Sequence, residues 1–238
     1  MDEQNNQASD FVRLTPTMQR VMKSAAKLQM VIPDAVLVGG TAAIIYARHR
    51  DSLDHDHVVA DLAERYEMVL DAVEASEGWA TSVRASRPPL TLLGSLDGVE
   101  AGLRQLRRSR PLETAEYVLP DGARLAVPTL REALRIKAYL VVQRNAVRDY
   151  LDVVGLADRA GIAFAAETLI GIDDYYLDRS ESDDSVRTQL VLKLAKPAPH
   201  DPVVMNELHH YRGLAEKWHD WKSVEAVCHE LALAVGQA

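Results

Sequence analysis

The chain has 238 residues, of which 47% are hydrophobic and 26% are charged, a composition typical of a globular protein with one large or two small domains. Its single cysteine, Cys228, excludes an internal disulfide and a zinc site built from cysteines. The net charge of −8 argues against a surface that is basic throughout, but not against a local basic groove. We expect a cytoplasmic protein without a membrane span, because the apolar runs are short and the polar start differs from a signal peptide.

The first 127 residues alternate between helical and strand-like patterns. Thr15 and Pro16 are typical of a helix start, and apolar residues then recur at helical spacing up to residue 31. We next expect a strand over 35–38, a helix over 41–50, a strand over 52–59 and a helix over 61–77. Strand-like stretches follow at 79–85, 89–95, 98–106 and 114–126, some of them separated by turn sequences.

The pattern changes at Pro128. Thr129 and Glu132 match a capping box, and from there to the end the sequence is helical almost throughout. The sequence therefore predicts an α+β protein, with a mixed α/β half over residues 1–127 and a helical half over residues 128–238.

Two aspartates, Asp54 and Asp56, lie one residue apart in the predicted strand 52–59. Side chains alternate along a strand, so both carboxylates point to one face, whereas His55 and His57 point to the other. Two like charges this close repel each other unless a cation lies between them. Magnesium suits that position, because proteins commonly hold it with one or two carboxylates together with substrate phosphates.

A glycine pair, Gly39-Gly40, separates the predicted strand 35–38 from the helix that follows. Such a turn exposes backbone N–H groups at a helix start, which suits a phosphate, and the Thr41 hydroxyl adds a further donor there. A glycine pair or a D-x-D sequence alone is usually an ordinary turn or loop. Their combination across one helix and one strand predicts a site for a nucleoside triphosphate and its metal.

Gly39-Gly40, a spacer of thirteen residues and Asp54-x-Asp56 resemble the signature of the nucleotidyltransferase superfamily, which has a polymerase-β-like fold and would give the first half a mixed sheet. The stretch 37–56 is similar in more detail to the AbiEii-type toxins of type IV toxin–antitoxin systems. The middle residue of D-x-D is usually apolar in those toxins and is His55 here.

The resemblance also implies a third carboxylate on a neighbouring strand. Glu100 is the best match, although Asp97 is nearby and Gly102 competes for the equivalent position.

Lys137 lies in the middle of an apolar helix face formed by Leu130, Ala133, Leu134, Leu140 and Val141. A lysine in such a place either extends its ammonium group to water or meets an anion. The next helix brings Arg148, Asp149 and Asp152, where the spacing of Arg148 and Asp152 also suits an ion pair that braces the helix. AbiEii-type toxins carry a lysine on one helix and R-D-x-x-D on the next, which these four residues match.

The resemblance covers about residues 35–160 and implies Mg²⁺-dependent transfer of a nucleotide from a nucleoside triphosphate, with Mn²⁺ as the alternative metal. The acceptor would be RNA, including tRNA, or protein, and an antitoxin would be the partner in a toxin–antitoxin or phage-defence pair. The 128–238 half would complete the active-site cleft. The implied catalytic residues are Asp54, Asp56, Lys137, Asp149 and Asp152; the nucleotide would contact Gly39, Gly40, Thr41, Lys137 and Arg148; the metal would be bound by Asp54, Asp56 and Glu100.

Two other interpretations stay open. His55 and the uncertain third acid favour a catalytically degraded module that binds a nucleotide or a partner protein. A zinc site with His55 and His57 is poorly supported, because these supply only two ligands. An RNA acceptor would need local basic side chains, for which Arg104, Arg107, Arg108 and Arg110 are the best candidates.

Overall fold

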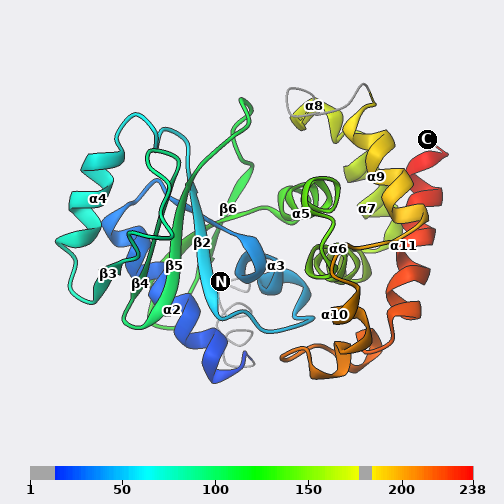
Figure 1. The fold of residues 1–238 in the computed structure, drawn as a ribbon, viewed down its shortest axis with the longest axis horizontal. Helices are drawn as coiled ribbons and strands as arrows, with labels where there is room; N and C mark the ends of the chain where they lie inside the picture. The colour runs from blue at the N-terminus through cyan, green and yellow to red at the C-terminus, as the bar shows by residue number, and fades with distance from the viewer. Residues whose placement is uncertain (1–13, 177–183, 238) are drawn as a thin grey trace. The chain divides into compact units, whose positions relative to one another are not determined.

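The computed structural model describes residues 14–176 and 184–237, which belong to two compact units. The first unit comprises residues up to 42 and residues 51–129, and the second comprises 43–50 and 130 onward. Figure 1 shows a sheet in the first unit and helices alone in the second. The predicted fold class, a mixed α/β part with a mixed sheet followed by a helical part, is confirmed.

The first unit is built on a five-stranded sheet in the order β1-β2-β5-β4-β3. Its strands are β1 (Val36–Val38), β2 (Asp54–Val59), β3 (Trp79–Thr81), β4 (Thr91–Leu96) and β5 (Val99–Gln105). Strands β2 and β5 run parallel and the other neighbours run antiparallel, so the sheet is mixed. A separate hairpin consists of β6 (Thr114–Val118) and β7 (Arg124–Pro128).

Helices α2 (Pro16–Val31) and α4 (Tyr66–Glu74) cover one face of this sheet. Helix α2 begins where expected, because Thr15 caps it by accepting a hydrogen bond from the Met18 amide and Pro16 occupies its first turn. Leu28 of α2 packs into the same buried cluster as Leu103 of β5. The opposite face of the sheet carries the polar side chains of β2 and β5, because buried and more exposed residues alternate along β2 and charged residues interrupt the buried ones of β5.

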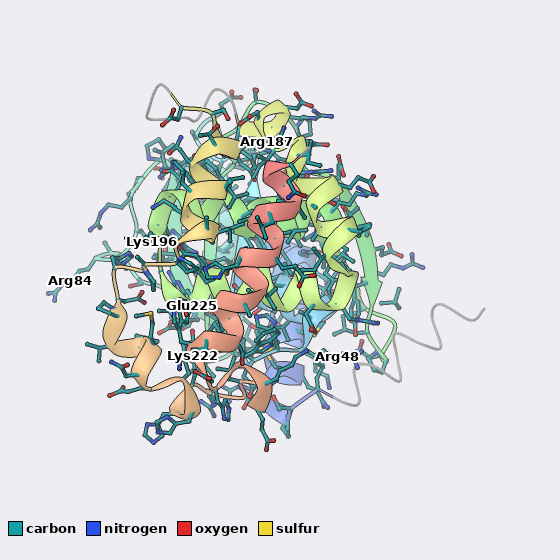
Figure 2. The ribbon with its side chains drawn as sticks, turned by 90° about the vertical axis from the view of Figure 1, so that its right-hand side faces the viewer. Arg48, Arg84, Arg187, Lys196, Lys222 and Glu225 are labelled. Carbon is teal, nitrogen blue, oxygen red and sulfur yellow. The ribbon has the colours of Figure 1, made fainter. Side chains whose placement is uncertain are left out.

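The second unit is a helical bundle. Its helices are α5 (Leu130–Arg144), α6 (Val147–Ala160), α7 (Ile162–Ile170), α8 (Asp173–Tyr176), α9 (Val186–Ala195), α10 (Pro202–Asn206) and α11 (Trp221–Gly236), with 3₁₀ turns η2 (Leu208–His210) and η3 (Glu216–Trp218). Helix α11 packs against both α9 and α7 (Figure 2). The Arg187 guanidinium of α9 donates to the carbonyl of Val235 in α11. None of the described helices is long and apolar enough to cross a membrane.

Three predicted elements differ from the structure. Helix α3 (Gly39–Ala47) includes the glycine pair instead of beginning after it. Gly39 has a φ of +76°, a backbone conformation that is strained for any residue with a side chain. The helix expected over 61–77 is confined to α4. The stretch 114–126 is a hairpin and not one strand, because its Pro-Asp-Gly sequence forms the turn and Gly122 has a φ of +86°.

Candidate active site

Asp54 and Asp56 both lie on β2 and face the side of the sheet that α2 and α4 leave uncovered. Strand register places Asp54 beside Glu100 and Asp56 beside Gly102 on β5. Asp54 is exposed and the side chain of Asp56 is 29% exposed. The two carboxylates therefore share one accessible face, as the alternation of strand side chains predicts.

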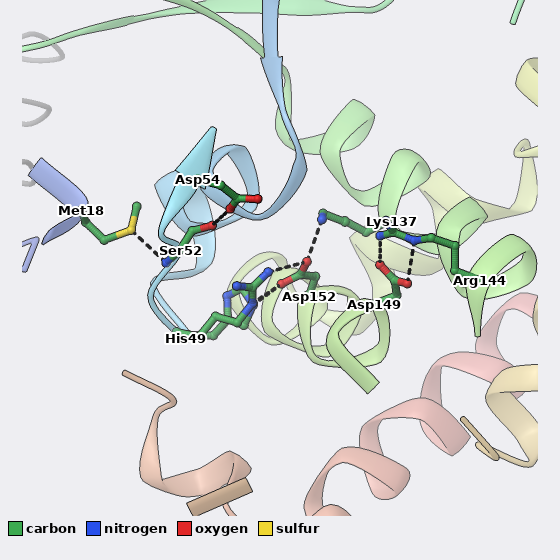
Figure 3. A network of polar contacts seen from close by, with 9 residues as sticks. Met18, His49, Ser52, Asp54, Lys137, Arg144, Asp149 and Asp152 are labelled. Atoms are coloured by element: carbon green, nitrogen blue, oxygen red, sulfur yellow. Dashed lines mark hydrogen bonds and ion pairs between the residues drawn. The ribbon is translucent and has the colours of Figure 1, made fainter. Parts of the chain in front are cut away.

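The two carboxylates have different partners. The Ser52 hydroxyl donates to Oδ1 of Asp54 at 2.9 Å (Figure 3), whereas Nε of Arg104 donates to Oδ1 of Asp56 at 3.2 Å. Gly102 lies directly beneath the second carboxylate, since a Cβ at this position would be 2.3 Å from Oδ1 of Asp56. The absence of a side chain at Gly102 is thus what gives Asp56 its place on the sheet.

The glycine pair lies next to Asp56. Val38, the last residue of β1, is the register partner of Asp56, so the chain turns into α3 beside this carboxylate. Thr41 differs from its expected role: its side chain is buried and its hydroxyl donates to the Asp54 carbonyl oxygen at 2.6 Å. That bond ties the start of α3 to the start of β2, which makes Thr41 a positioning residue for the aspartates.

The carboxylate oxygens of Asp54 and Asp56 lie on one face and suit a divalent ion such as Mg²⁺, which commonly takes its remaining ligands from water and phosphate. Glu100 is exposed on the same face, as its register with Asp54 requires. Within residues 14–176 and 184–237, however, no group of three His, Cys, Asp or Glu side chains is arranged to hold a metal. The expected metal set of Asp54, Asp56 and Glu100 stays a prediction, and the two aspartates on β2 are its leading candidate ligands.

His55 and His57 lie on the opposite face of β2, in the interior. The His55 ring contacts the Ser24 hydroxyl of α2 at 3.0 Å, and the two imidazole rings meet edge to face at 5.3 Å. Burial lowers the pKa of His55 to about 4, and burial together with the nearby His55 holds the pKa of His57 well below its ordinary value. Both rings are neutral at pH 7 and point away from the aspartates.

The second unit contains its own polar cluster around Asp152 (Figure 3). The carboxylate of Asp152 is fully buried and accepts from Nε2 of His49 at 2.7 Å and from Nε of Arg50 at 2.8 Å. The Lys137 ammonium lies 2.7 Å from its other oxygen. Lys137 is 3% exposed, so it does not extend to water, and the anion it meets in this structure is Asp152.

Burial and neighbouring charges act in opposite directions on the pKa values of this cluster. Burial raises the pKa of the Asp152 carboxyl, but the positive charges of Arg50 and Lys137 and the hydrogen bond from His49 outweigh burial and hold this pKa well below its ordinary value. Burial lowers the pKa of His49 despite its bond to Asp152, so this imidazole is neutral at pH 7. The Asp152 carboxylate is thus ionised at pH 7, and the neutral His49 imidazole serves as one of its hydrogen-bond donors.

The other expected residues of α6 lie apart from this cluster. Asp149 is buried and forms an ion pair with Arg144 of α5 (Figure 3). Arg148 is exposed, and the structure of residues 14–176 and 184–237 contains no ion pair between Arg148 and Asp152. The helix-bracing pair suggested by their spacing is therefore wrong, because Asp152 points into the bundle toward Lys137, Arg50 and His49.

Sequence reasoning missed His49, Arg50 and Arg104 as partners of the aspartates. The sequence "ARHRDS" held a usable signal, since basic residues directly before the D-x-D strand are suited to pair with acids elsewhere. Of the four arginines proposed as a basic groove, Arg108 is buried and donates to the carbonyls of Arg110 and Pro111. Arg108 therefore holds its own loop, and the other three arginines are exposed.

Two solved structures resemble this chain in fold. MenT4, a nucleotidyltransferase toxin of Mycobacterium tuberculosis H37Rv, superposes with a TM-score of 0.61 over 99% of this chain and 90% of its own, at 16% identity. The chain shares the fold of MenT4. JHP933 of Helicobacter pylori has a TM-score of 0.52 over 94% of both chains, at 15% identity. At these identities the likeness is one of fold, and the AbiEii-type assignment stays a prediction.

Curated relatives are similar in sequence but much longer. The heme uptake protein MmpL11 of Mycobacterium tuberculosis is 30% identical over 249 aligned residues, which cover 95% of this chain and 24% of that protein. The mycolic acid-containing lipids exporter MmpL11 of Mycolicibacterium smegmatis is 37% identical over 131 residues, covering 55% of this chain and 13% of its own length. The chain thus spans at most about a quarter of these relatives. No protein-family model matches the sequence.

Proposed function

We propose that the chain is a divalent-metal-dependent nucleotidyltransferase that moves a nucleotide from a nucleoside triphosphate to an RNA or protein acceptor. The observation that carries the proposal is the pair of accessible carboxylates, Asp54 and Asp56, on the uncovered sheet face beside the Gly39-Gly40 turn. The likeness of fold to the nucleotidyltransferase toxin MenT4 supports it, because the superposition covers 99% of this chain with a TM-score of 0.61.

Asp54 and Asp56 would hold Mg²⁺ or Mn²⁺. When bound, such an ion screens the charge of the phosphates and favours ionisation of the attacking hydroxyl. The backbone amides of Gly39 and Gly40 would bind phosphate oxygens at the start of α3, where the helix dipole favours an anion. Thr41 would keep these two parts in register through its bond to the Asp54 carbonyl.

The nucleotide contacts expected of Lys137 and Arg148 in the second unit rest on the sequence resemblance alone: the Lys137 ammonium is buried beside Asp152, and Arg148 is exposed. Asp152 itself is a poor general base at neutral pH, since a base works best when its pKa is close to the working pH and the pKa of Asp152 is far lower. We assign Asp152 to orienting Lys137 and Arg50, and Asp149 to orienting Arg144.

The test is a transfer assay with labelled nucleoside triphosphates, Mg²⁺ or Mn²⁺, and RNA or protein acceptors including tRNA. Asp54→Asn and Asp56→Asn should each lower transfer by roughly 100- to 1000-fold, the scale for losing one strong transition-state contact. Asp71→Asn is the matched control, because Asp71 is an exposed aspartate of α4 on the covered side of the sheet. Equal transfer in all four proteins would contradict the assignment.

A toxin role belongs to the same proposal and is supported by the fold that the chain shares with MenT4. Expression of the intact chain should slow bacterial growth, and expression of the Asp54→Asn variant should not. Co-expression with a neighbouring candidate antitoxin should restore growth. If neither the intact chain nor the Asp54→Asn variant slows growth, the toxin role is wrong. The labelled transfer assay then decides separately whether the chain is a nucleotidyltransferase.

A module that binds without catalysing transfer is the second candidate. It is favoured by the MmpL11 relatives, in which a segment similar to this chain is a minor part of a protein named for transport. His55 in the D-x-D sequence favours it as well. Calorimetry that detects nucleotide or partner binding, with no transfer to any acceptor, would support this candidate over the enzyme.

A further inference from the structure

We propose that Arg104 is a positioning residue that holds Asp56 in the metal-free protein and turns to the triphosphate when a divalent ion binds that carboxylate. The inference rests on the proposed function and deepens it, because it adds a residue that couples metal binding to nucleotide binding. It concerns only the first unit, where all the participating groups lie on two neighbouring strands.

The geometry of β2 and β5 brings Arg104 to Asp56. Gly102 is the register partner of Asp56, and Arg104 follows two residues later on the same face of β5. A Cβ at Gly102 would be 2.3 Å from Oδ1 of Asp56, so the carboxylate lies over the bare backbone of β5. From there, Nε of Arg104 reaches the same oxygen at 3.2 Å.

Asp54 provides the internal contrast. Its partner is the neutral Ser52 hydroxyl, and among the described residues Asp54 has no ion pair. Of the two aspartates, only Asp56 is paired with a cation, and the Arg104 guanidinium contacts the carboxylate oxygen that a metal would bind. A guanidinium and a divalent ion that need the same carboxylate oxygen compete, because the positive charges repel and the lone pairs are shared.

The exchange requires little energy. The side chains of Arg104 and Asp56 are 45% and 29% exposed, and ion pairs at this level of exposure contribute little to stability. Once released, the guanidinium keeps its full charge and its planar set of donors, which match phosphate oxygens. Arg104 thus has a partner in both states, the carboxylate without ligands and the triphosphate with them.

This arrangement predicts effects of opposite sign when the charge of Arg104 is removed. Arg104→Gln should bind Mn²⁺ more tightly without nucleotide, by about two- to fivefold, which is the factor that corresponds to losing an exposed competing ion pair. The same variant should bind a non-hydrolysable nucleoside triphosphate with Mn²⁺ more weakly, by roughly tenfold, because a charged phosphate contact is lost. A purely structural role would not separate the two affinities in this way.

The experiment measures free Mn²⁺ by electron paramagnetic resonance during titration of the protein, and nucleotide affinity by calorimetry. Arg107→Gln is the matched control, since Arg107 is exposed near the end of β5 and removes the same charge without contacting Asp56. Melting temperatures of both variants should equal that of the unmodified protein, which checks the fold.

The outcomes separate this inference from the proposed function. Mn²⁺ binding that is lost in Asp56→Asn but unchanged or weakened in Arg104→Gln would overturn the role of Arg104 and leave the metal site intact. Equal tightening in Arg104→Gln and Arg107→Gln would overturn it too, because general charge would then explain the effect. Mn²⁺ binding that is the same in Asp56→Asn as in the unmodified protein would overturn both the inference and the metal site.

Discussion

Asp54 in the first unit and Asp152 in the second are both candidate site residues, but their surroundings are opposite in burial and in charge. Asp54 is exposed on an uncovered sheet face, and its partner is one neutral hydroxyl. Asp152 is completely buried and is held by Lys137, Arg50 and His49. The exposed carboxylate has lone pairs left for a ligand, whereas those of the buried one are used inside the protein.

The difference separates two kinds of contribution to a site. Removing an exposed, weakly paired charge changes what the protein binds and hardly changes its stability. Removing one partner from a buried ion cluster leaves uncompensated charge in the interior, which is costly. Sequence patterns assigned both aspartates to catalysis on equal terms, and burial is what distinguishes a ligand-binding group from a group that orients others.

The largest expected effect is on stability in the second unit. Asp152→Asn should lower the free energy of unfolding by about 3–5 kcal/mol, because Lys137 and Arg50 would remain buried without their carboxylate. Asp54→Asn should change it by less than about 0.5 kcal/mol, as is usual for exposed positions. Urea denaturation of both variants at pH 7.5 measures the contrast. Similar losses in both proteins would mean that the surroundings of the two aspartates do not differ as described.

Two glycines sharpen the comparison with smaller effects, because each lies against a partner of one cluster. A Cβ at Gly155 of α6 would be 2.6 Å from the His49 ring, and a Cβ at Gly102 would be 2.3 Å from Oδ1 of Asp56. Gly155→Ala should cost about 1–3 kcal/mol of stability, since the buried ring cannot move away. Gly102→Ala should cost less, because the end of the Asp56 side chain can shift into solvent.

Metal affinity should respond in the opposite order: Gly102→Ala should weaken Mn²⁺ binding more than Gly155→Ala does. Gly102→Ala displaces a candidate metal ligand, so Mn²⁺ affinity should fall by roughly tenfold while the melting temperature changes little. Gly155→Ala should lower the melting temperature and leave Mn²⁺ affinity as it was. Thermal melts and Mn²⁺ titrations on the same samples decide this, and a loss of metal affinity in Gly155→Ala alone would contradict it.

Local patterns predicted the elements that depend on neighbouring residues. The Thr15-Pro16 start of α2 and the shared strand face of Asp54 and Asp56 follow from capping and alternation, and both are confirmed. The 114–126 stretch was predicted as one strand, although the Pro-Asp-Gly turn inside it was readable. Element positions were thus accessible wherever the controlling contacts lie within a few residues.

Partners distant in sequence were not accessible. Lys137 pairs with Asp152, and Arg50 pairs with the same carboxylate from 102 residues away, which no spacing rule relates. The burial of Thr41 and Arg108 likewise depends on the packing of separate elements. A helical spacing of four residues suggested that Arg148 binds Asp152, but the side of α6 that faces the bundle decided otherwise.

The smallest expected effect tests whether the two faces of β2 are independent, since the aspartates point to one face and the buried histidines to the other. Burial, and then the neighbouring His55, lower the pKa of His57, so its imidazole takes up a proton in the unfolded chain at a higher pH than in the folded protein. Its contribution is therefore fully present above the unfolded pKa of about 6.5 and is lost as the pH falls below that value.

His57→Leu removes that dependence while filling the same apolar space. Between pH 7.5 and pH 5.5 the unmodified protein should lose about 1 kcal/mol more stability than the variant, because one proton bound only by the unfolded state is absent from the variant. Urea denaturation at the two pH values measures the loss. Mn²⁺ affinity at pH 7.5 should be equal in both proteins, since His57 points away from Asp54 and Asp56. A metal affinity that changes with His57→Leu would show that the buried face of β2 sets the position of the exposed carboxylates, and the contrast between an independent ligand-binding face and a structural interior would then fail within a single strand.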